Sequence, residues 1–378
     1  MKCEGPSRAV IDLDAYAHNM GVIRSFAGPK RRVIAVVKAD AYGHGAALLG
    51  RAALRGGAFM LGVATAQEAV ELRHAGIEAP ILVMVSPREE ELPLVVEHRL
   101  TPMISGVETA RQLGELAREA GRVSTIHCKV DTGMGRQGFA ADQAPEALQA
   151  ISRITHLDIE GIATHFPSAD TPDDPFTLSQ IKTFRQVIRQ VERLGVPFEF
   201  AHAANSAALI NYADSLFDAV RPGLMSYGVW PMTETSERSP LRRVLRWETH
   251  VVQVRELPDG ATVGYNRSFT ANGPIRTAVL PVGYADGYRR HLSNNADVLI
   301  RGRRCPVRGI VSMDQTIVDV SALPEVRCGD TAVLLGADGD ETVTADELAR
   351  RAGTISYDIL TGIGKRVVRE YVGDGSDD

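Results

Sequence analysis

Residues 33–45 read Val33-Ile34-Ala35-Val36-Val37-Lys38-Ala39-Asp40-Ala41-Tyr42-Gly43-His44-Gly45. The apolar run at the start has the length and the β-branched residues of a buried strand. It ends directly in Lys38, and strand ends in α/β folds are where the chemistry is placed. A lysine with apolar neighbours at such a place can lose its proton and form a Schiff base with a carbonyl compound.

Short strand-like runs recur along the first part of the chain, and stretches with helical spacing separate them. After Val33–Val37 the candidate strands are Met60–Val63, Ile81–Val85, Thr101–Ile104, Ser124–Val130, Ile159–Thr164, Phe198–His202 and Ala219–Arg221. Eight strand–helix units within about 220 residues match the length of a (β/α)8 barrel, or TIM barrel. An open, doubly wound sheet is the alternative, because the number of strands alone does not prove that the sheet closes.

The pattern changes after Pro240. β-Branched residues alternate from Val244 to Val254, and Gly and Pro turns then recur, which is typical of an all-β domain. One helix is expected near Thr344–Ala352, because this segment opens on a Thr-Ala-Asp-Glu capping pattern. The sequence therefore predicts an α/β protein with a barrel over residues 11–240 and a C-terminal all-β domain over residues 241–378.

Composition favours a cytoplasmic enzyme. The net charge of the 378 residues is -5, so nothing points to a nucleic acid or an anionic membrane surface as partner. Met1–Asp14 is polar and lacks the apolar core of a signal peptide, and no apolar run is long enough to span a bilayer. The four cysteines have no metal-ligand spacing and suggest no disulfide framework, so no metal is expected.

Polar strings follow several of the predicted strands, as Lys38 follows the first. They are Lys129-Val130-Asp131-Thr132-Gly133-Met134-Gly135-Arg136, Thr164-His165-Phe166, His202-Ala203-Ala204-Asn205-Ser206-Ala207-Ala208 and Arg221-Pro222-Gly223-Leu224. Taken singly, His165 reads as a hydrogen-bonded structural histidine and Arg221 as a surface ion-pair partner. Because the carboxyl ends of barrel strands surround one mouth, the strings together favour a functional site there.

These strings resemble those of the alanine racemase family, whose members are fold-type III enzymes that depend on pyridoxal 5'-phosphate (PLP), and the resemblance extends over nearly the whole chain. It implies that the chain interconverts L-alanine and D-alanine as a homodimer. It also implies that an N-terminal strand, at about residues 1–10, joins the C-terminal domain. A role in D-alanine biosynthesis for peptidoglycan precursors would follow, with D-alanine breakdown as the alternative.

The resemblance also implies which residues bind PLP. Lys38 would bind it covalently, His165 would stack on the pyridine ring, and Arg221, held in place by His202, would donate a hydrogen bond to the pyridine nitrogen. The remaining cofactor-binding residues, most of them at the phosphate, would be Tyr42, Asn205, Ser206, Gly223, Leu224 and Tyr357, with Gly223 and Leu224 contributing backbone N–H groups.

An arginine opposite the pyridine nitrogen has a chemical meaning. Arginine does not give up its proton in proteins, so the ring nitrogen accepts a hydrogen bond and stays unprotonated. A protonated nitrogen would make the ring a deep electron sink and would favour a long-lived carbanion. Arg221 therefore suits a carbanion that is quickly reprotonated at the same carbon, which indicates racemisation.

Racemisation needs a base on each face of the α carbon. By resemblance, one base is Lys38 and the other is Tyr265 of the partner subunit, in Thr262-Val263-Gly264-Tyr265-Asn266; taken alone, this string reads as a turn with a half-buried tyrosine. A phenol has a pKa near ~10, so cationic neighbours must lower it for this role. Met313 would present its backbone N–H to the substrate carboxylate from the partner subunit, and Arg136 would help to hold that carboxylate.

Lys129 shares a strand face with Asp131 and would lie near Arg136. Two buried cations in contact are costly. In relatives the matching lysine is often carbamylated by CO₂, which makes it an anion that pairs with the arginine. We carry this over to Lys129 as a hypothesis, with a neutral lysine as the alternative.

Substrate breadth stays open. By resemblance, Tyr284, Arg290 and Asp170 would line the polar corridor through which the substrate reaches the site. The family often has an arginine at the position of Ile310, and the loss of that cation keeps a broad-specificity racemase, acting for example on serine, as an alternative.

A PLP barrel decarboxylase is a further alternative, disfavoured by Arg221 and Tyr265. A non-catalytic PLP-binding protein is disfavoured by the C-terminal domain.

Overall fold

The computed structural model describes residues 5–232 and 239–374. Contacts divide the chain into two compact units. We call Tyr16–Ala41 with Ala46–Arg242 the barrel unit, and the chain up to Ala15, Tyr42–Gly45 and Arg243–Asp374 the C-terminal unit. Cys3 lies outside the described residues, whereas Cys128, Cys305 and Cys328 are free thiols.

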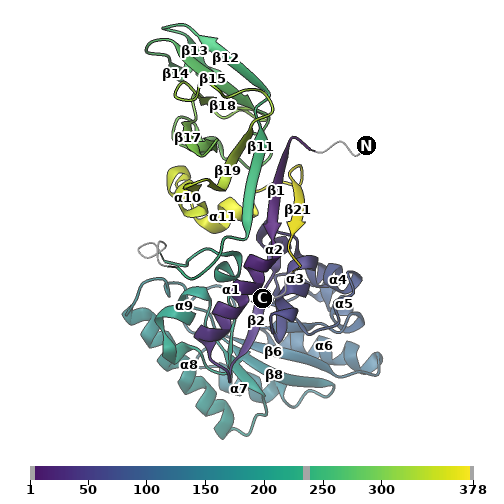
Figure 1. Cartoon of the computed structure of the whole chain (residues 1–378). Helices are drawn as coiled ribbons and strands as arrows, with labels where there is room; N and C mark the ends of the chain where they lie inside the picture. The colour runs from purple at the N-terminus through teal and green to yellow at the C-terminus, as the bar shows by residue number, and fades with distance from the viewer. Residues whose placement is uncertain (1–4, 233–238, 375–378) are drawn as a thin grey trace. The chain divides into compact units, whose positions relative to one another are not determined.

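The barrel unit, which Figure 1 shows as ribbons, contains parallel strands, and their pairings form a closed ring. They are β2 (Arg32–Val36), β3 (Met60–Val63), β4 (Ile81–Val83), β5 (Thr101–Ile104), β6 (Ser124–Asp131), β8 (Leu157–Ala163), β9 (Phe200–His202) and β10 (Ala219–Val220). Their order is β5-β4-β3-β2-β10-β9-β8-β6, and pairing of β5 with β6 closes the ring, with β7 (Phe139–Ala140) paired to β6 outside it. The (β/α)8 barrel is therefore confirmed and the open sheet is excluded.

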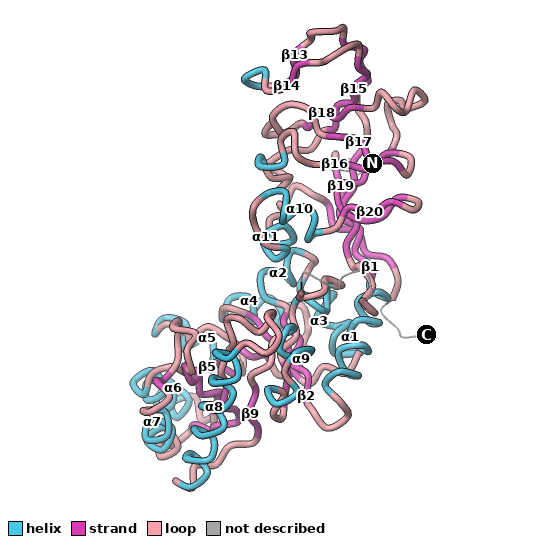
Figure 2. The backbone as a smooth tube through the Cα atoms, turned by 90° about the vertical axis from the view of Figure 1, so that its left-hand side faces the viewer, coloured by secondary structure: helices cyan, strands magenta, loops and turns pink. Residues whose placement is uncertain are grey.

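Helices follow the strands and surround the barrel (Figure 2). They are α1 (Leu13–Ala27), α2 (Lys38–Gly43), α3 (Ala46–Arg55), α4 (Ala66–His74), α5 (Leu92–Glu97), α6 (Val107–Glu119), α7 (Ala144–Ile151), α8 (Pro175–Arg193) and α9 (Ser206–Asn211). Inside the ring, a buried apolar cluster that includes Ile34, Met103 and Phe200 fills the barrel. This packed layer supports the polar residues at the carboxyl ends of the strands.

The C-terminal unit is built on β-sheets, as expected. Its largest sheet has the strand order β17-β16-β19-β11-β1-β21, with β20 paired to β19. The strands of this sheet are β1 (Ser7–Asp12), β11 (Leu245–His250), β16 (Asp297–Ile300), β17 (Arg303–Pro306), β19 (Thr331–Asp338), β20 (Glu341–Val343) and β21 (Val368–Val372). The N-terminal strand β1 pairs antiparallel with β11 and parallel with β21, so the two ends of the chain meet in one sheet.

Smaller sheets and two helices complete this unit. β12 (Gln253–Leu257), β15 (Ile275–Leu280) and β18 (Thr316–Asp319) form one sheet, and β13 (Thr262–Val263) pairs with β14 (Phe269–Thr270). The helices are α10 (Ala345–Ala352) and α11 (Ser356–Thr361). The expected capping of α10 is confirmed, because the hydroxyl of Thr344 accepts a hydrogen bond of 3.0 Å from the Glu347 N–H.

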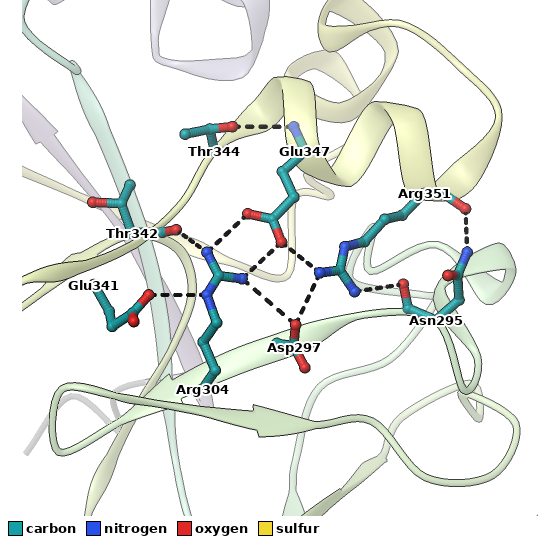
Figure 3. A network of polar contacts seen from close by, with 8 residues as sticks. All are labelled: Asn295, Asp297, Arg304, Glu341, Thr342, Thr344, Glu347 and Arg351. Atoms are coloured by element: carbon teal, nitrogen blue, oxygen red, sulfur yellow. Dashed lines mark hydrogen bonds and ion pairs between the residues drawn. The ribbon is translucent and has the colours of Figure 1, made fainter. Parts of the chain in front are cut away.

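An ion-pair network fastens α10 to the strands beside it (Figure 3). The carboxylate of Glu347 lies 2.7 Å from Arg304 of β17 and 2.8 Å from Arg351 of α10. Arg351 also lies 2.9 Å from Asp297 of β16, and Arg304 lies 2.9 Å from Glu341. Burial raises the pKa of Glu347, but the two guanidinium groups outweigh burial and hold its pKa below the usual value.

Replacing Glu347 tests how much this network contributes to the free energy of unfolding. Glu347→Ala leaves two guanidinium groups without the carboxylate between them, and we expect it to lower the free energy of unfolding by about 1–3 kcal/mol. Glu341→Ala is the control: its side chain is 45% exposed, and its loss should cost under about 1 kcal/mol. Urea unfolding of both variants at neutral pH measures the difference.

The pH dependence follows from the lowered pKa. A carboxyl group whose pKa is lower in the folded chain stabilises that chain above its unfolded pKa, and this contribution is lost as the pH falls through the folded pKa. The difference between Glu347→Ala and the parent should therefore shrink at acidic pH. Equal loss of stability from Glu347→Ala and Glu341→Ala at neutral pH would contradict the account.

Candidate active site

Lys38 stands where the chain leaves β2 in an unusual conformation. Residues 39–42 have φ angles between 51° and 53°, which is the left-handed region, and none of them is glycine. Each such residue costs roughly 1–2 kcal/mol, so the surroundings must hold the turn in place. Glu68 of α4 accepts a hydrogen bond of 2.7 Å from the Ala39 N–H, and Asp40 accepts one of 2.7 Å from the Ala46 N–H. The path of the chain after Lys38 is thus fixed by side chains.

The environment of Lys38 lowers its pKa. Burial is the largest cause, Arg136 lowers the pKa further, Glu68 raises it, and Arg221 lowers it by a smaller amount. A neutral amine is the nucleophilic form of lysine and the form that bonds to a carbonyl carbon. The structure therefore places Lys38 where its pKa is lowered, and the role of Lys38 stays a prediction.

Arg221, directly after β10, is buried and held by acceptors from neighbouring strands. Its Nη1 donates to Nδ1 of His202 at 2.8 Å, and its Nη2 donates to the carbonyl oxygens of Thr164 at 2.8 Å and Ala203 at 2.9 Å. Nδ1 of His165 lies 3.3 Å from the same Nη2. Burial lowers the pKa of Arg221 to about 10, so the guanidinium stays charged at neutral pH.

The Nε–H of Arg221 is among its N–H groups that no hydrogen bond between the described residues uses. A guanidinium has five N–H groups in all. An unused guanidinium N–H can donate to a ligand that presents an acceptor. The nitrogen of an unprotonated pyridine ring fits this requirement, and hence the arrangement fits PLP.

Both histidines beside Arg221 are neutral. Burial lowers the pKa of His165 and of His202 well below the usual value, and the charge of Arg221 adds to this effect. A neutral imidazole can lie flat against another aromatic ring without placing a charge there. His165 therefore has the character that stacking on a pyridine ring requires.

Lys129 lies inside the mouth of the barrel. It pairs in register with Ala163 of β8, which pairs in turn with His202 of β9. Only 5% of its surface is exposed, and burial, Arg221 and Arg136 together lower its pKa well below the usual value. No ion pair of Lys129 occurs between the described residues. A charged ammonium group is therefore disfavoured at this position.

The loop after β6 presents Arg136 to the mouth. The carboxylate of Asp131 accepts hydrogen bonds from the N–H groups of Gly133 at 2.8 Å and Gly135 at 2.9 Å, which folds the loop back on its strand. Arg136 is exposed, and within residues 5–232 and 239–374 it forms no ion pair. The site thus offers a free guanidinium for an anionic group such as a carboxylate.

Ser206 and Gly223 are neighbours, as expected of two residues at one phosphate. The Ser206 hydroxyl accepts hydrogen bonds from the N–H groups of Gly223 at 3.0 Å and Met225 at 3.3 Å, so its own proton remains to be donated. Leu224 opens a 3-10 helix, where the first N–H group has no acceptor within the helix. Asn205 caps α9 by accepting from the Ala208 N–H at 2.9 Å, which is a structural contact.

The C-terminal unit exposes its predicted site residues. Tyr265 is 68% exposed and Met313 is 52% exposed, which is unusual for large apolar side chains. Tyr284 donates its N–H to the Ser312 carbonyl at 3.0 Å, and the Met313 carbonyl accepts from Ala285 at 3.0 Å. Tyr284 and Met313 therefore lie on adjoining loops of this unit.

The other predicted residues are placed as follows. The rings of Tyr42 and Tyr357 lie 5.6 Å apart within the C-terminal unit. Arg290 is exposed in the same unit, and Asp170 is exposed in the loop between β8 and α8. Asp170 belongs to the barrel unit, so the predicted corridor residues are divided between the two units.

Sequence reasoning missed two residues that extend the site inward. His127 of β6 lies 2.8 Å from His202, and Glu160 of β8 lies 3.0 Å from His127. His127 stands two residues before Lys129, so strand alternation places both on one face and could have found it. Nothing in the sequence near Glu160 signals its role.

Comparisons with known proteins agree with this geometry. The family model of the alanine racemase N-terminal domain matches residues 11–231, and that of the alanine racemase C-terminal domain matches residues 244–371. An alanine racemase of Symbiobacterium thermophilum is 42% identical over 371 residues, which cover 98% of each chain.

Solved structures are also similar. The alanine racemase of a D-cycloserine-producing Streptomyces lavendulae is 35% identical, with a TM-score of 0.93 and 98% of each chain covered. The alanine racemase of Bartonella henselae, whose structure contains covalently bound pyridoxal phosphate, is 29% identical, with a TM-score of 0.88 and coverage of 97% of this chain and 99% of that one. With both family domains matched and the barrel site assembled, the chain belongs to the alanine racemase family.

Proposed function

We infer that this chain is a PLP-dependent enzyme that interconverts L-alanine and D-alanine. Membership of the family supports this activity, and the buried Arg221 with its unused Nε–H is the structural observation that carries it. PLP, when bound, draws electrons from the α carbon of an attached amino acid and so acidifies its proton. The residues of the chain then decide what happens to that proton.

The barrel unit supplies the cofactor side of the proposed site. Lys38 would hold PLP through its amine, His165 would stack on the ring, and Arg221 would donate to the ring nitrogen. Because Arg221 keeps its proton, it would favour an unprotonated ring nitrogen and quick return of the proton to the α carbon. The phosphate is assigned to Ser206, Gly223 and Leu224, and by the resemblance also to Asn205, Tyr42 and Tyr357.

Proton transfer is assigned to two bases on opposite faces of the α carbon. Lys38 would take the proton from D-alanine, and Tyr265 of a partner subunit would take it from L-alanine. Arg136 and the Met313 N–H of the partner hold the substrate carboxylate. The high exposure of Tyr265 and Met313 supports a homodimer, because both side chains are open to a second copy of the chain.

Domain roles and location are further parts of the proposal. Residues 11–240 are assigned to PLP binding, and residues 241–378 with the N-terminal strand are assigned to the partner-facing side. We place the enzyme in the cytoplasm, with D-alanine for peptidoglycan precursors as its product. No described helix combines the length and apolar character that crossing a bilayer requires.

Broad specificity is the second candidate, and Ile310 is the observation that favours it. This apolar residue lies beside Gly264, which precedes Tyr265: a Cβ built on Gly264 would lie 3.2 Å from the Ile310 nitrogen. The loss of the cation that the family often has at this position would change which amino acids reach the site. Comparing racemisation of alanine and serine by the same preparation decides between the two candidates.

Arg221→Glu tests the role assigned to the arginine. A carboxylic acid at this position can protonate the ring nitrogen, so the deprotonated substrate should live longer. We expect racemisation to fall and pyruvate, the transamination product, to appear. Arg185→Glu is the control, because Arg185 lies outside the site and Asp214 is its ion-pair partner among the described residues. Parent-like racemisation without pyruvate in Arg221→Glu would contradict the assignment.

Tyr265→Ala should separate the two directions of proton transfer. Lys38 can still exchange the proton on its own face, so D-alanine should take up solvent deuterium at Cα while L-alanine should exchange far more slowly. Net racemisation should drop by roughly 10²–10⁴-fold, the usual contribution of a general base. Proton NMR in deuterium oxide measures both exchange rates. Equal residual exchange from the two enantiomers would mean that Tyr265 is a packing residue.

Mixing two inactive variants tests the homodimer. A Lys38→Ala chain and a Tyr265→Phe chain, combined after mild dissociation, should recover part of the parent activity, because one site of the mixed dimer then holds both bases. Lys38→Ala combined with itself is the control. If mixed dimers form, as two affinity tags can establish, and no activity returns, Tyr265 serves its own chain.

Carbamylation of Lys129 is proposed because its burial and cationic neighbours disfavour an ammonium group. A carbamate would place a negative charge beside Arg136. Carbon-13 NMR with labelled bicarbonate should show a carbamate signal in the parent that is absent in Lys129→Ala. The same spectrum in both proteins would leave Lys129 as a neutral lysine.

A further inference from the structure

A chain of hydrogen bonds runs from Arg221 into the barrel and ends on a carboxylate. Nη1 of Arg221 lies 2.8 Å from Nδ1 of His202, and Nε2 of His202 lies 2.8 Å from Nδ1 of His127. Nε2 of His127 lies 3.0 Å from Oε2 of Glu160. His202 lies in β9, His127 in β6 and Glu160 in β8, and Arg221 comes directly after β10, all within the barrel unit.

Only one arrangement of protons satisfies this chain when both histidines are neutral. Arg221 can only donate, so Nδ1 of His202 accepts and the proton of His202 is on Nε2. That proton is donated to Nδ1 of His127, whose own proton must then be on Nε2. The carboxylate of Glu160 can only accept, and it therefore completes the chain.

Packing prevents either ring from escaping this arrangement. His127 and His202 are completely buried, and their ring centroids lie 4.8 Å apart. A Cβ built on Gly161 would lie 2.7 Å from Nδ1 of His127, so only glycine at that position leaves room for the imidazole. Burial also lowers the pKa of both histidines, which keeps them uncharged.

Glu160 is the one group in the chain with a negative charge, and Arg221 is the one with a positive charge. A second carboxylate, Glu199, contributes charge near His127 but pairs with Arg32 at 3.3 Å. Only Glu160 of the two is hydrogen-bonded to the imidazole. The polar chain thus joins a buried cation to a partly exposed anion through two polarised rings.

We propose that His127 and Glu160 are positioning residues, which fix the tautomer of His202 and through it the orientation of Arg221 toward the cofactor ring. Neither residue contacts Arg221 in the described hydrogen bonds, so each acts through His202. The proposal deepens the proposed function and rests on the role given there to Arg221. Its first test does not depend on that role.

Nitrogen-15 NMR of the full-length, PLP-loaded protein with labelled histidine reads the tautomers directly. Single histidine replacements assign the signals of His127 and His202. We expect both rings to be neutral with the proton on Nε2. A proton on Nδ1 of His202, or a cationic ring at either position, would overturn the proposal even if the chain is an active racemase.

Variants of Glu160 test the functional consequence. Glu160→Leu removes the terminal acceptor, and we expect kcat to fall on the order of tenfold in both directions, with the KM for alanine little changed. Glu160→Gln keeps a carbonyl acceptor and should retain the Nε2–H tautomers and recover much of kcat. Glu199→Leu, which removes a neighbouring charge without a bond to His127, is the matched control and should resemble the parent.

Folding and activity are kept apart by thermal unfolding of each variant. A loss of kcat in folded Glu160→Leu, together with shifted His202 nitrogen signals, supports the proposal. Equal kcat and equal spectra for Glu160→Leu and Glu199→Leu would overturn it, because the terminal carboxylate would then have no effect on His202. A complete absence of racemisation in the parent would refute the proposed function and leave the NMR result standing.

Discussion

The burial of the Arg221 guanidinium is the constraint on which the rest of the site depends. A group that keeps its charge and cannot accept a hydrogen bond must be surrounded by acceptors. Two backbone carbonyls and two neutral histidines, all at the carboxyl ends of β8 and β9, meet this need. Closing the barrel brings these strand ends together, so the fold and the electronic character of the site are coupled.

The same cation shapes the chemistry of its neighbours. Arg221 contributes to the lowered pKa of Lys38, Lys129, His165 and His202. Burial is the largest cause of each lowered pKa, and the charge of Arg221 adds to it. A cofactor ring that only accepts a hydrogen bond suits this environment, whereas a ring that must be protonated would add another cation to it. In the proposed function, that preference is the physical reason for racemisation over transamination.

Features that depend on residues close together in the sequence could be predicted from it. The strands were predicted because short apolar runs alternate with helical spacing, and Lys38 and Arg221 could be placed because each follows such a run. The cap of α10 was predicted from Thr344 and Glu347, which are three residues apart. Strand ends differ from the predicted ones by residues at the edges of these runs, where apolar character alone does not decide pairing.

Features that depend on distant residues could not be predicted in this way. The left-handed turn after Lys38 contains Ala39, Asp40, Ala41 and Tyr42, and only contacts such as that of Glu68 with the Ala39 N–H make it tolerable. Asn205 was predicted to bind the cofactor, and its side chain caps α9 in the structure. The sequence could not distinguish these two roles, because one asparagine before a helix is compatible with both. The link from His202 to Glu160 joins residues of three strands, and only the closed barrel reveals it.

The protonation state of the cofactor ring tests the central claim most directly. Nitrogen-15 NMR of the full-length enzyme, loaded with PLP labelled at the pyridine nitrogen, distinguishes a protonated from an unprotonated ring. The account predicts an unprotonated nitrogen that accepts a hydrogen bond at neutral pH, and a changed signal in Arg221→Glu. A protonated ring nitrogen in the parent enzyme would contradict the claim that Arg221 limits the chemistry to racemisation.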